Sequence, residues 1–297
     1  MLAYVPFVQQ PSIALGPVTL AAFGGIVASS VAIGFALGAR RFAALGLDRE
    51  LGERFAWWVV AGGFVSAHLF ALLLYFPEKV VADPWSLLRL WEDISSFGGI
   101  VGGALAIALF LRLHGRHLDA ATRWAYVDTA AYVFPISLMI GRFACALAHD
   151  HPGTVTRFPL AIALDEPAAQ SLIAQAYASD GRAAELPPTE ALAQLGFHDL
   201  GWYEFVYLAI VVVPLTLAHE RRARRAGWPR GDALARFIVL YMPVRFALDF
   251  LRVRDVRYAG LTPAQWTALV ALALLPLVLR HARRVATSVE STSMTER

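Results

Sequence analysis

Two arginines inside apolar stretches are the residues of this sequence that most require a chemical explanation. Arg142 ends an apolar run that begins near Pro135, and Arg245 lies in Tyr241-Met-Pro-Val-Arg-Phe-Ala-Leu-Asp249. A charge at membrane depth is costly and usually marks a functional site. Because guanidinium is a planar fork of donors that matches a phosphate or a carboxylate, these arginines predict an anion-binding site at the edge of a membrane.

Arg245 shares one predicted helix face with other polar residues. A spacing of four places Tyr241 and Asp249 on that face, and Arg252, seven residues beyond Arg245, returns to it. Two interpretations remain open. Either Arg245 and Asp249 form an ion pair that holds helices together, or Arg245 clamps an anion with Arg142. For Arg142, the alternative is that its side chain reaches from the end of a helix to the membrane surface.

A histidine-rich turn, His149-Asp150-His151, follows Arg142 and precedes Pro152-Gly153. Imidazoles two residues apart chelate a metal only in a turn or extended chain, which Pro152-Gly153 permits, and His198 with Asp199 would complete such a site. The pattern is unspecific, so we predict no metal ion and no cofactor. Cys145 is the single cysteine, which excludes an intramolecular disulfide and a cysteine-rich metal centre.

Glycines and one acid complete the polar features. Gly98, Gly99, Gly102 and Gly103 leave one end of an apolar run without side-chain bulk. This predicts either close helix packing or a bare backbone that a substrate approaches. Glu204, which follows Trp202 and Tyr203, is an acid at membrane depth that can pair with the arginines.

The elements that must position these residues are membrane helices. The chain has 297 residues, 58% hydrophobic and 16% charged, with a mean hydropathy of +0.54, which excludes an ordinary soluble domain. About 20 apolar residues cross a bilayer as a helix. We therefore predict an all-α integral membrane protein with seven transmembrane helices, at residues 18–37, 55–75, 97–113, 124–147, 202–217, 237–251 and 262–279.

Arginine clusters predict the orientation of these helices. They follow the first, third, fifth and seventh spans, which places them all on one side, and the positive-inside rule makes that side the cytoplasm. The amino terminus is then outside and the carboxyl terminus inside. Arg252, Arg254 and Arg257 run against the rule but are outnumbered. The pI near 9.2 reflects this topology and anionic lipid, not a nucleic-acid partner.

The remaining segments form a small head and a tail. Residues 1–284 make the membrane domain, in which 149–200 is an insertion on the outer side with short helices expected at 168–179 and 189–195. The Ser/Thr-rich segment 285–297 is predicted to be a disordered cytoplasmic tail. The usual hydrolase and nucleotide-binding signatures are missing from the sequence.

The order of these motifs resembles the prolipoprotein diacylglyceryl transferase family. The resemblance covers most of the chain outside 165–195 and the tail. It rests on Gly16-Pro17, on 91–103 beginning at Trp91, on 141–153, 198–204 and 241–252, and on Gly260-Leu-Thr-Pro-Ala-Gln-Trp266.

This resemblance implies a seven-span enzyme of the bacterial inner membrane with a periplasmic head. The reaction it implies moves the diacylglyceryl group of phosphatidylglycerol to the lipobox cysteine thiol of a prolipoprotein signal peptide, forming a thioether and releasing glycerol phosphate. Such a reaction needs a thiolate and a cation for the departing phosphate.

The resemblance also assigns roles to residues. It maps the family's phosphatidylglycerol-binding arginine onto Arg142, and the sixth-span arginine with its tyrosine and acid onto Arg245, Tyr241 and Asp249. We further expect the following residues to contact the substrate or shape the lipid entry: Glu204, Arg252, Gly98, Gly99 and Gly153. The acceptor cysteine belongs to another protein, so Cys145 is not expected to be catalytic.

Departures from the family pattern concern the proton acceptor. The usual His-Gly-Gly motif reads Phe97-Gly98-Gly99, so the histidine often proposed as general base is absent. Cys145 and Ala148 replace asparagines, Asp150 replaces a glutamate and Phe23 replaces a tyrosine. We predict that His149 or His151, supported by Asp150, deprotonates the acceptor thiol. Two alternatives are a divergent paralogue that binds lipid or signal peptides, and a transporter of an anionic solute.

Overall fold

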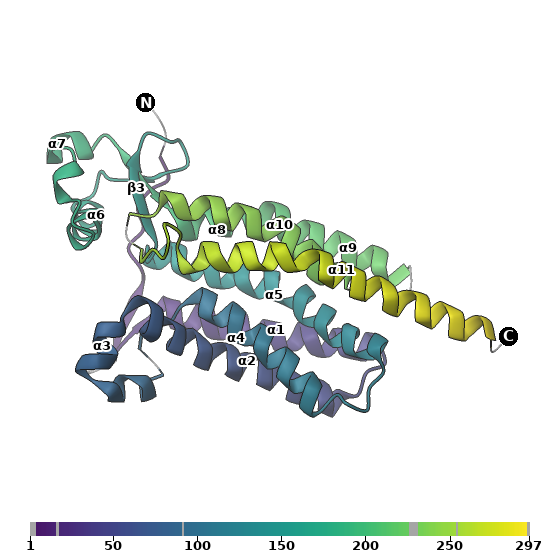
Figure 1. Ribbon diagram of the computed structural model, residues 1–297. Helices are drawn as coiled ribbons and strands as arrows, with labels where there is room; N and C mark the ends of the chain where they lie inside the picture. Colours follow the sequence, from purple (N-terminus) through teal and green to yellow (C-terminus); the bar gives the residue numbers. More distant parts are fainter. Residues whose placement is uncertain (1–3, 16–17, 91, 226–230, 254, 296–297) are drawn as a thin grey trace.

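The computed structural model describes residues 4–15, 18–90, 92–225, 231–253 and 255–295 and is mostly helical (Figure 1). Several residues used in the sequence analysis lie outside this part of the chain: Gly16, Pro17, Trp91, Arg230 and Arg254. Among the described residues, six helical segments are long and apolar enough to cross a membrane. They are α1 (Ala22–Ala44), α2 (Arg49–Phe70) continued by the π-helical η1 (Ala71–Tyr75), α4 (Ser96–Leu113), α5 (Ala120–Ala148), the continuous run of α8 (Leu200–Tyr207), η4 (Leu208–Val212) and α9 (Val213–Arg225), and α11 (Pro263–Thr295) up to Arg284.

Polar side chains fix where several of these helices begin. Asp48, Ser95, Asp119 and Asp199 each accept a hydrogen bond from a backbone N–H in the first turn of the helix that follows. Such caps satisfy donors that have no partner within the helix. The caps at Ser95 and Asp199 therefore fix the starts of α4 and α8, which carry Phe97 and Glu204.

The structure corrects several predicted boundaries. The first helix begins at Ala22 because β2 (Val18–Ala21) pairs with β1 (Ser12–Leu15) as an antiparallel hairpin. The sixth predicted span, 237–251, corresponds to α10 (Asp232–Leu248), whose 17 residues are fewer than in any of the six segments above. The predicted disorder of 285–297 is wrong as far as Thr295, since neither proline nor glycine follows Pro276 and α11 continues.

Arg252 does not lie on the face of α10. The helix ends at Leu248 and is followed by a 3-10 turn, η5 (Asp249–Leu251). Arg252 itself is extended, with φ −66° and ψ 136°. The seven-residue spacing therefore does not return Arg252 to the face of Arg245, because the helical period stops first.

Glycines allow α2 and α4 to approach closely. A Cβ atom added to Gly102 would lie 2.1 Å from Cβ of Ser66, and one on Gly98 would lie 2.4 Å from Cβ of Phe70. Gly99 has ordinary room, with its nearest neighbour at 3.8 Å. Of the two readings of this glycine stripe, Gly98 and Gly102 fit close helix packing.

The segment between α5 and α8 folds into a head with its own core. Its strands β3 (Pro152–Thr156), β5 (Gly196–Asp199) and β4 (Ile162–Ala163) form an antiparallel sheet in the order β3-β5-β4. Helices α6 (Pro167–Ser179) and α7 (Thr189–Leu192) lie where short helices were predicted. The predicted all-α membrane fold is confirmed in its helical body, and the head and the hairpin add short strands that apolar periodicity did not reveal.

The head lies beyond one end of the helices and the carboxyl terminus lies at the other (Figure 1). Helix α5 packs against α1, α8 and α10, and α10 packs against α11. Two short elements, α3 (Pro77–Ala82) and η2 (Pro84–Leu88), connect η1 to α4. Within the head, η3 (Ala183–Glu185) links α6 to α7.

Candidate active site

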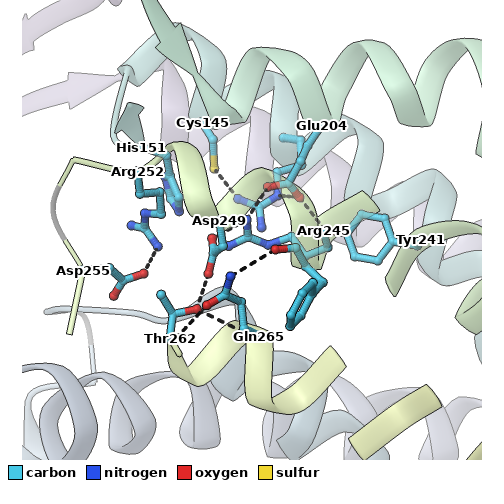
Figure 2. Close-up of polar contacts among 12 residues, drawn as sticks. Cys145, His151, Glu204, Tyr241, Arg245, Asp249, Arg252, Asp255, Thr262 and Gln265 are labelled. Carbon is cyan, nitrogen blue, oxygen red and sulfur yellow. Dashed lines mark hydrogen bonds and ion pairs between the residues drawn. The ribbon is translucent and has the colours of Figure 1, made fainter. Parts of the chain in front are cut away.

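Four of the charged residues singled out from the sequence, Arg142, Glu204, Arg245 and Asp249, converge at the head end of the bundle. They come from the end of α5, from α8, from the end of α10 and from η5 (Figure 2). These elements are far apart in the sequence, and their packing brings the side chains into one buried cluster. Arg142 and Arg245 are each only 1% exposed.

Glu204 lies between the two arginines. Its Oε2 is 3.0 Å from Nε of Arg142, and its Oε1 is 3.3 Å from Nη1 of Arg245. The hydroxyl of Tyr241 donates to Oε2 of the same carboxylate. Tyr241 therefore orients Glu204, whereas the contacts of Arg245 are with the carboxylates of Glu204 and Asp249. One acid fixes the relative positions of both cations.

Asp249, which begins η5 directly after α10, holds Arg245 with Oδ1 2.6 Å from Nη1. The other oxygen of Asp249 accepts a hydrogen bond from Oγ1 of Thr262. At the start of α11, N of Gln265 donates to Thr262 Oγ1 at 3.1 Å, and N of Thr262 donates to Gln265 Oε1 at 3.0 Å. This is a capping box. It ties the first turn of α11 to the carboxylate that orients Arg245.

Sequence reasoning missed Thr262 and Gln265. The signal was present, since Thr262-Pro-Ala-Gln265 directly precedes an apolar run and has the Thr-x-x-Gln spacing of a capping box. That segment was used only as a family motif. What the sequence could not reveal is that Thr262 reaches Asp249, which lies on another helix.

The cluster is balanced in charge but has unused donors. Two guanidinium groups face two carboxylates, on Glu204 and Asp249, and each of the four side chains is at most 1% exposed. Within the described residues, Nη2 of Arg142 and Nε of Arg245 have no hydrogen-bond partner. Buried donors are almost always paired, so unpaired guanidinium N–H groups mark a place for an acceptor from outside the chain. An anion with several oxygens, such as a phosphate, meets this need.

Phe97 occupies the position where the family motif has histidine. Its ring lies beneath Arg245, with Cζ of the arginine 4.7 Å from the ring centroid. A guanidinium over an aromatic face is held by a cation–π interaction. Phe97 therefore helps to place Arg245, but a phenyl ring cannot accept a proton.

Cys145, Asp150 and His151 form a second cluster directly beside Arg142. Sγ of Cys145 is 3.9 Å from Nη1 of Arg142. One ligand-type atom from each of Cys145, Asp150 and His151 lies within 4.8 Å of the others. Partial burial would raise the pKa of Asp150, but the charges of His151 and Arg142 outweigh it and hold that pKa below its ordinary value. Asp150 is thus a carboxylate at neutral pH, in contact with Nδ1 of His151.

His149 points into the head instead. It ends α5 in the left-handed region, with φ 49°. Its Nδ1 is 2.6 Å from Oδ2 of Asp199, its Nε2 is 3.2 Å from the carbonyl oxygen of Val8, and its ring stacks on Phe7. Because both ring nitrogens already have partners, His149 is placed to join the head to the amino-terminal segment.

The remaining predicted site residues lie apart from the two arginines. Arg252 pairs with Asp255 through Nη1, at 2.6 Å from Oδ2. A Cβ atom on Gly153 would lie 2.6 Å from the carbonyl oxygen of Leu251, so this glycine lets β3 approach the end of η5. Gly98 packs against α2. Nδ1 of His198 is 2.8 Å from the hydroxyl of Tyr203. Among the described residues, neither His198 nor His149 lies in a group of three possible metal ligands, so the histidine set weighed as a metal site is not brought together.

Fold and site together define a polytopic helical membrane protein with two paired arginines buried at one end. The chain belongs to the prolipoprotein diacylglyceryl transferase family, whose model matches residues 11–280. This confirms the resemblance found in the sequence.

Relatives named phosphatidylglycerol–prolipoprotein diacylglyceryl transferase match along most of the chain. The protein of Chromohalobacter salexigens is 28% identical over 94% of this chain and 91% of its own. That of Symbiobacterium thermophilum is 24% identical over 92% of each chain, and that of Azotobacter vinelandii is 26% identical over 96% of each. These names do not favour the transporter alternative or a binding paralogue.

Proposed function

We propose that this protein transfers the diacylglyceryl group of phosphatidylglycerol to the lipobox cysteine thiol of a prolipoprotein, forming a thioether and releasing glycerol phosphate. The observation that carries the proposal is the pair of buried arginines, held by Glu204, with guanidinium N–H groups that have no partner in the described chain. Family membership supports the same reaction.

The phosphate of the lipid would lie against Arg142 and Arg245. In the reaction, the diacylglyceryl carbon–oxygen bond breaks and its electron pair leaves on the phosphate oxygen. Donors already aimed at that oxygen stabilise the developing charge without reorganisation. Asp249 and Phe97 hold Arg245 from two sides, and Glu204 fixes Arg142 relative to it. Preorganisation of this kind is the main contribution that we assign to the chain.

The acceptor thiol would be activated beside Arg142, at Asp150 and His151. Phe97 cannot act as a base, and both nitrogens of His149 are engaged. His151 is 16% exposed and Asp150 is 37% exposed, so a thiol arriving from the head side can reach them. We expect His151→Ala to lose activity, whereas His149→Ala should act through the stability of the head.

The topology proposed for this reaction has seven spans in the bacterial inner membrane. Helix α10 has 17 residues and is about 26 Å long at 1.5 Å per residue, and η5 extends it toward the thickness of a bilayer. The head would be periplasmic, the amino terminus outside and the carboxyl terminus cytoplasmic, as the arginine clusters predict.

Complementation tests the proposed function. In a strain depleted of its own diacylglyceryl transferase, this chain should restore growth and lipoprotein lipidation, and Arg142→Ala should fail. Arg157→Ala, which removes an exposed arginine of the head, is the matched control and should rescue. Failure of the parent chain despite membrane insertion, or rescue by Arg142→Ala, would contradict the proposal.

A further inference from the structure

A second ion pair lies just beyond the cluster that holds Arg142 and Arg245. Nη1 of Arg252 is 2.6 Å from Oδ2 of Asp255, and the two side chains are 15% and 1% exposed. Arg252 directly follows the short turn η5, which begins with Asp249. From the sequence, Arg252 was expected to contact the substrate, whereas Asp255, beyond the predicted span 237–251, was not considered.

Each partner of this pair has one polar atom left over. Nε of Arg252 and Oδ1 of Asp255 are buried and have no hydrogen-bond partner within the described part of the chain. Buried polar atoms without a partner are uncommon in folded proteins and cost free energy. One of these atoms is a donor and the other is an acceptor. A ligand that satisfies both must donate and accept hydrogen bonds at neighbouring points.

The backbone holds this pair in a fixed place. Arg252 forms an antiparallel bridge with Gly153 of β3, and the N–H of Val253 donates to the carbonyl oxygen of Pro152 at 3.4 Å. Val253 is 3% exposed and belongs to the hydrophobic core of the head. The pair is therefore organised before a ligand arrives, which lowers the entropic cost of binding.

The pair is also a neighbour of the arginine that is proposed to bind the phosphate. In the view of Figure 2, Arg252 and Asp255 point toward each other, and Asp249 lies between this pair and Arg245. Burial raises the pKa of Asp255, whereas the charges of Arg252 and Arg245 and the backbone N–H of Val256 oppose the increase. The charge of Arg245 thus acts on this carboxylate, and a group joined to a phosphate at Arg245 has the pair within its surroundings.

We propose that Arg252 and Asp255 bind the glycerol of the phosphatidylglycerol headgroup, while the two buried arginines bind its phosphate. The inference rests on the proposed function for the identity of the lipid. A hydroxyl group both donates and accepts hydrogen bonds, and the headgroup glycerol carries two hydroxyls on neighbouring carbons. A hydroxyl of this glycerol donates to Oδ1 of Asp255, and a hydroxyl oxygen accepts from Nε of Arg252. The pair then determines which lipid headgroup is used.

Other ligands match the pair less well. An ethanolamine headgroup carries an ammonium, which has three donors and no acceptor, so it cannot accept from Arg252 and is repelled by its charge. The main chain of the acceptor peptide offers both a donor and an acceptor. It is not joined to the phosphate, however, and the position of the pair next to Arg245 favours the headgroup.

Two lipids that differ only in these hydroxyls test the inference. Phosphatidylpropanol has the charge, the acyl chains and the three-carbon headgroup of phosphatidylglycerol but neither hydroxyl. With purified full chain and a synthetic lipobox peptide, kcat/KM is measured for each lipid in turn. Wild-type protein should use phosphatidylglycerol better by about tenfold or more, because a site that hydrogen-bonds a hydroxyl rejects an analogue without it.

Two variants of the pair should lose this preference. Arg252→Met together with Asp255→Leu replaces a buried ion pair by apolar side chains of similar size, which folded proteins often tolerate. Arg252→Lys keeps a cation for Asp255 but has no Nε–H. Both should lower kcat/KM for phosphatidylglycerol toward the value for phosphatidylpropanol, which should itself stay unchanged.

The matched control makes the same double change in an exposed pair of the same kind. Asp83 and Arg89 are 2.8 Å apart, and Asp83→Leu together with Arg89→Met should keep the wild-type preference. A role of Arg252 and Asp255 in the loop or in peptide binding would lower kcat/KM for both lipids by one factor. An unchanged ratio in the double variant, or equal use of both lipids by wild-type protein, would overturn the inference and leave the proposed function intact.

A binding measurement tests the pair without turnover. Native mass spectrometry of the purified protein with equal amounts of the two lipids should show preferential retention of phosphatidylglycerol, and the double variant at Arg252 and Asp255 should lose it. Equal retention by wild-type protein would overturn the inference. Selective retention with no lipidation of the peptide would instead reject the proposed function and keep the headgroup site.

Discussion

Glu204 is the residue on which the arrangement of the site depends most. Its two oxygens contact Arg142, Arg245 and Tyr241, and the residue is only 1% exposed. Removing one partner of a buried ion pair leaves an uncompensated charge and typically costs about 3–5 kcal/mol. Here the loss would release two cations that otherwise repel each other.

Glu204→Gln tests this dependence. Glutamine keeps the size of the side chain but removes the negative charge, so the buried cluster carries an excess of positive charge. We expect a lower unfolding temperature and a loss of lipidation of about 100-fold or more, because the arginines are no longer held in place. Thermal unfolding in detergent and product formation are the measurements. Full activity in Glu204→Gln would show that the bridge is not needed.

Several site residues were predictable from the sequence, and their contacts were not. Charges in apolar runs identified Arg142, Arg245 and Glu204, and the spacing of four identified Asp249 as a partner of Arg245. That Glu204 bridges both arginines depends on how α5, α8 and α10 pack. Cys145 was within reach of prediction, since it lies three residues after Arg142 on the same helix face.

At the scale of elements, helix ends and helix contacts decide where the site residues lie. Apolar runs predicted the helices well because a membrane span has a required length. They did not predict the strands of the head or the hairpin before α1, because strand pairing is not visible in the apolar periodicity of one segment, and they did not predict that α10 ends at Leu248.

The capping box of α11 gives a prediction at this scale. Thr262→Ala removes the cap and the hydrogen bond to Asp249, and should cost about 1–2 kcal/mol of stability and lower activity through Arg245. Thr267→Ala, which removes a hydroxyl bonded only within the same helix, is the control and should change little. The lipidation rate and the unfolding temperature are measured for both variants. Equal effects of Thr262→Ala and Thr267→Ala would show that the hydrogen bond to Asp249 does not matter for the site.

The contact between α2 and α4 gives a second prediction at the scale of elements. Gly102→Ala places Cβ 2.1 Å from Cβ of Ser66 and must push the helices apart, at a cost of about 1–3 kcal/mol or more. Gly103→Ala meets its nearest neighbour at 3.9 Å and should be neutral or slightly stabilising, since alanine favours helix. Thermal unfolding of the two variants in detergent is the measurement. A Gly102→Ala protein as stable as Gly103→Ala would argue against the close packing.

At the scale of the whole molecule, the head is joined to the helices on both sides of the site. The αL turn at His149 leads from α5 into β3, and Asp199 ends β5 and caps α8. The pair between His149 and Asp199 connects these two passages. The stability of the head therefore bears on the turn that carries Asp150 and His151.

The pH dependence of the head follows from His198. Burial lowers the pKa of this imidazole below its ordinary 6.5, so the folded state favours the neutral form. Its contribution to stability is present above pH 6.5 and is lost as the pH falls toward the folded-state pKa, where the unfolded chain binds the proton first. We expect the unfolding temperature to decrease over that range, and His198→Gln to reduce the decrease. A wild-type protein whose stability is flat below pH 6.5 would contradict this.

The central claim is that Arg142 and Arg245 together bind the phosphate of phosphatidylglycerol for transfer to a thiol. The most direct measurement is mass spectrometry of a synthetic lipobox peptide incubated with the purified protein in phosphatidylglycerol vesicles. The peptide should gain one diacylglyceryl group, Arg142→Ala and Arg245→Ala should each slow this gain by at least 100-fold, and Arg157→Ala should leave it unchanged. Diacylglyceryl transfer at the wild-type rate by Arg142→Ala and Arg245→Ala would contradict it.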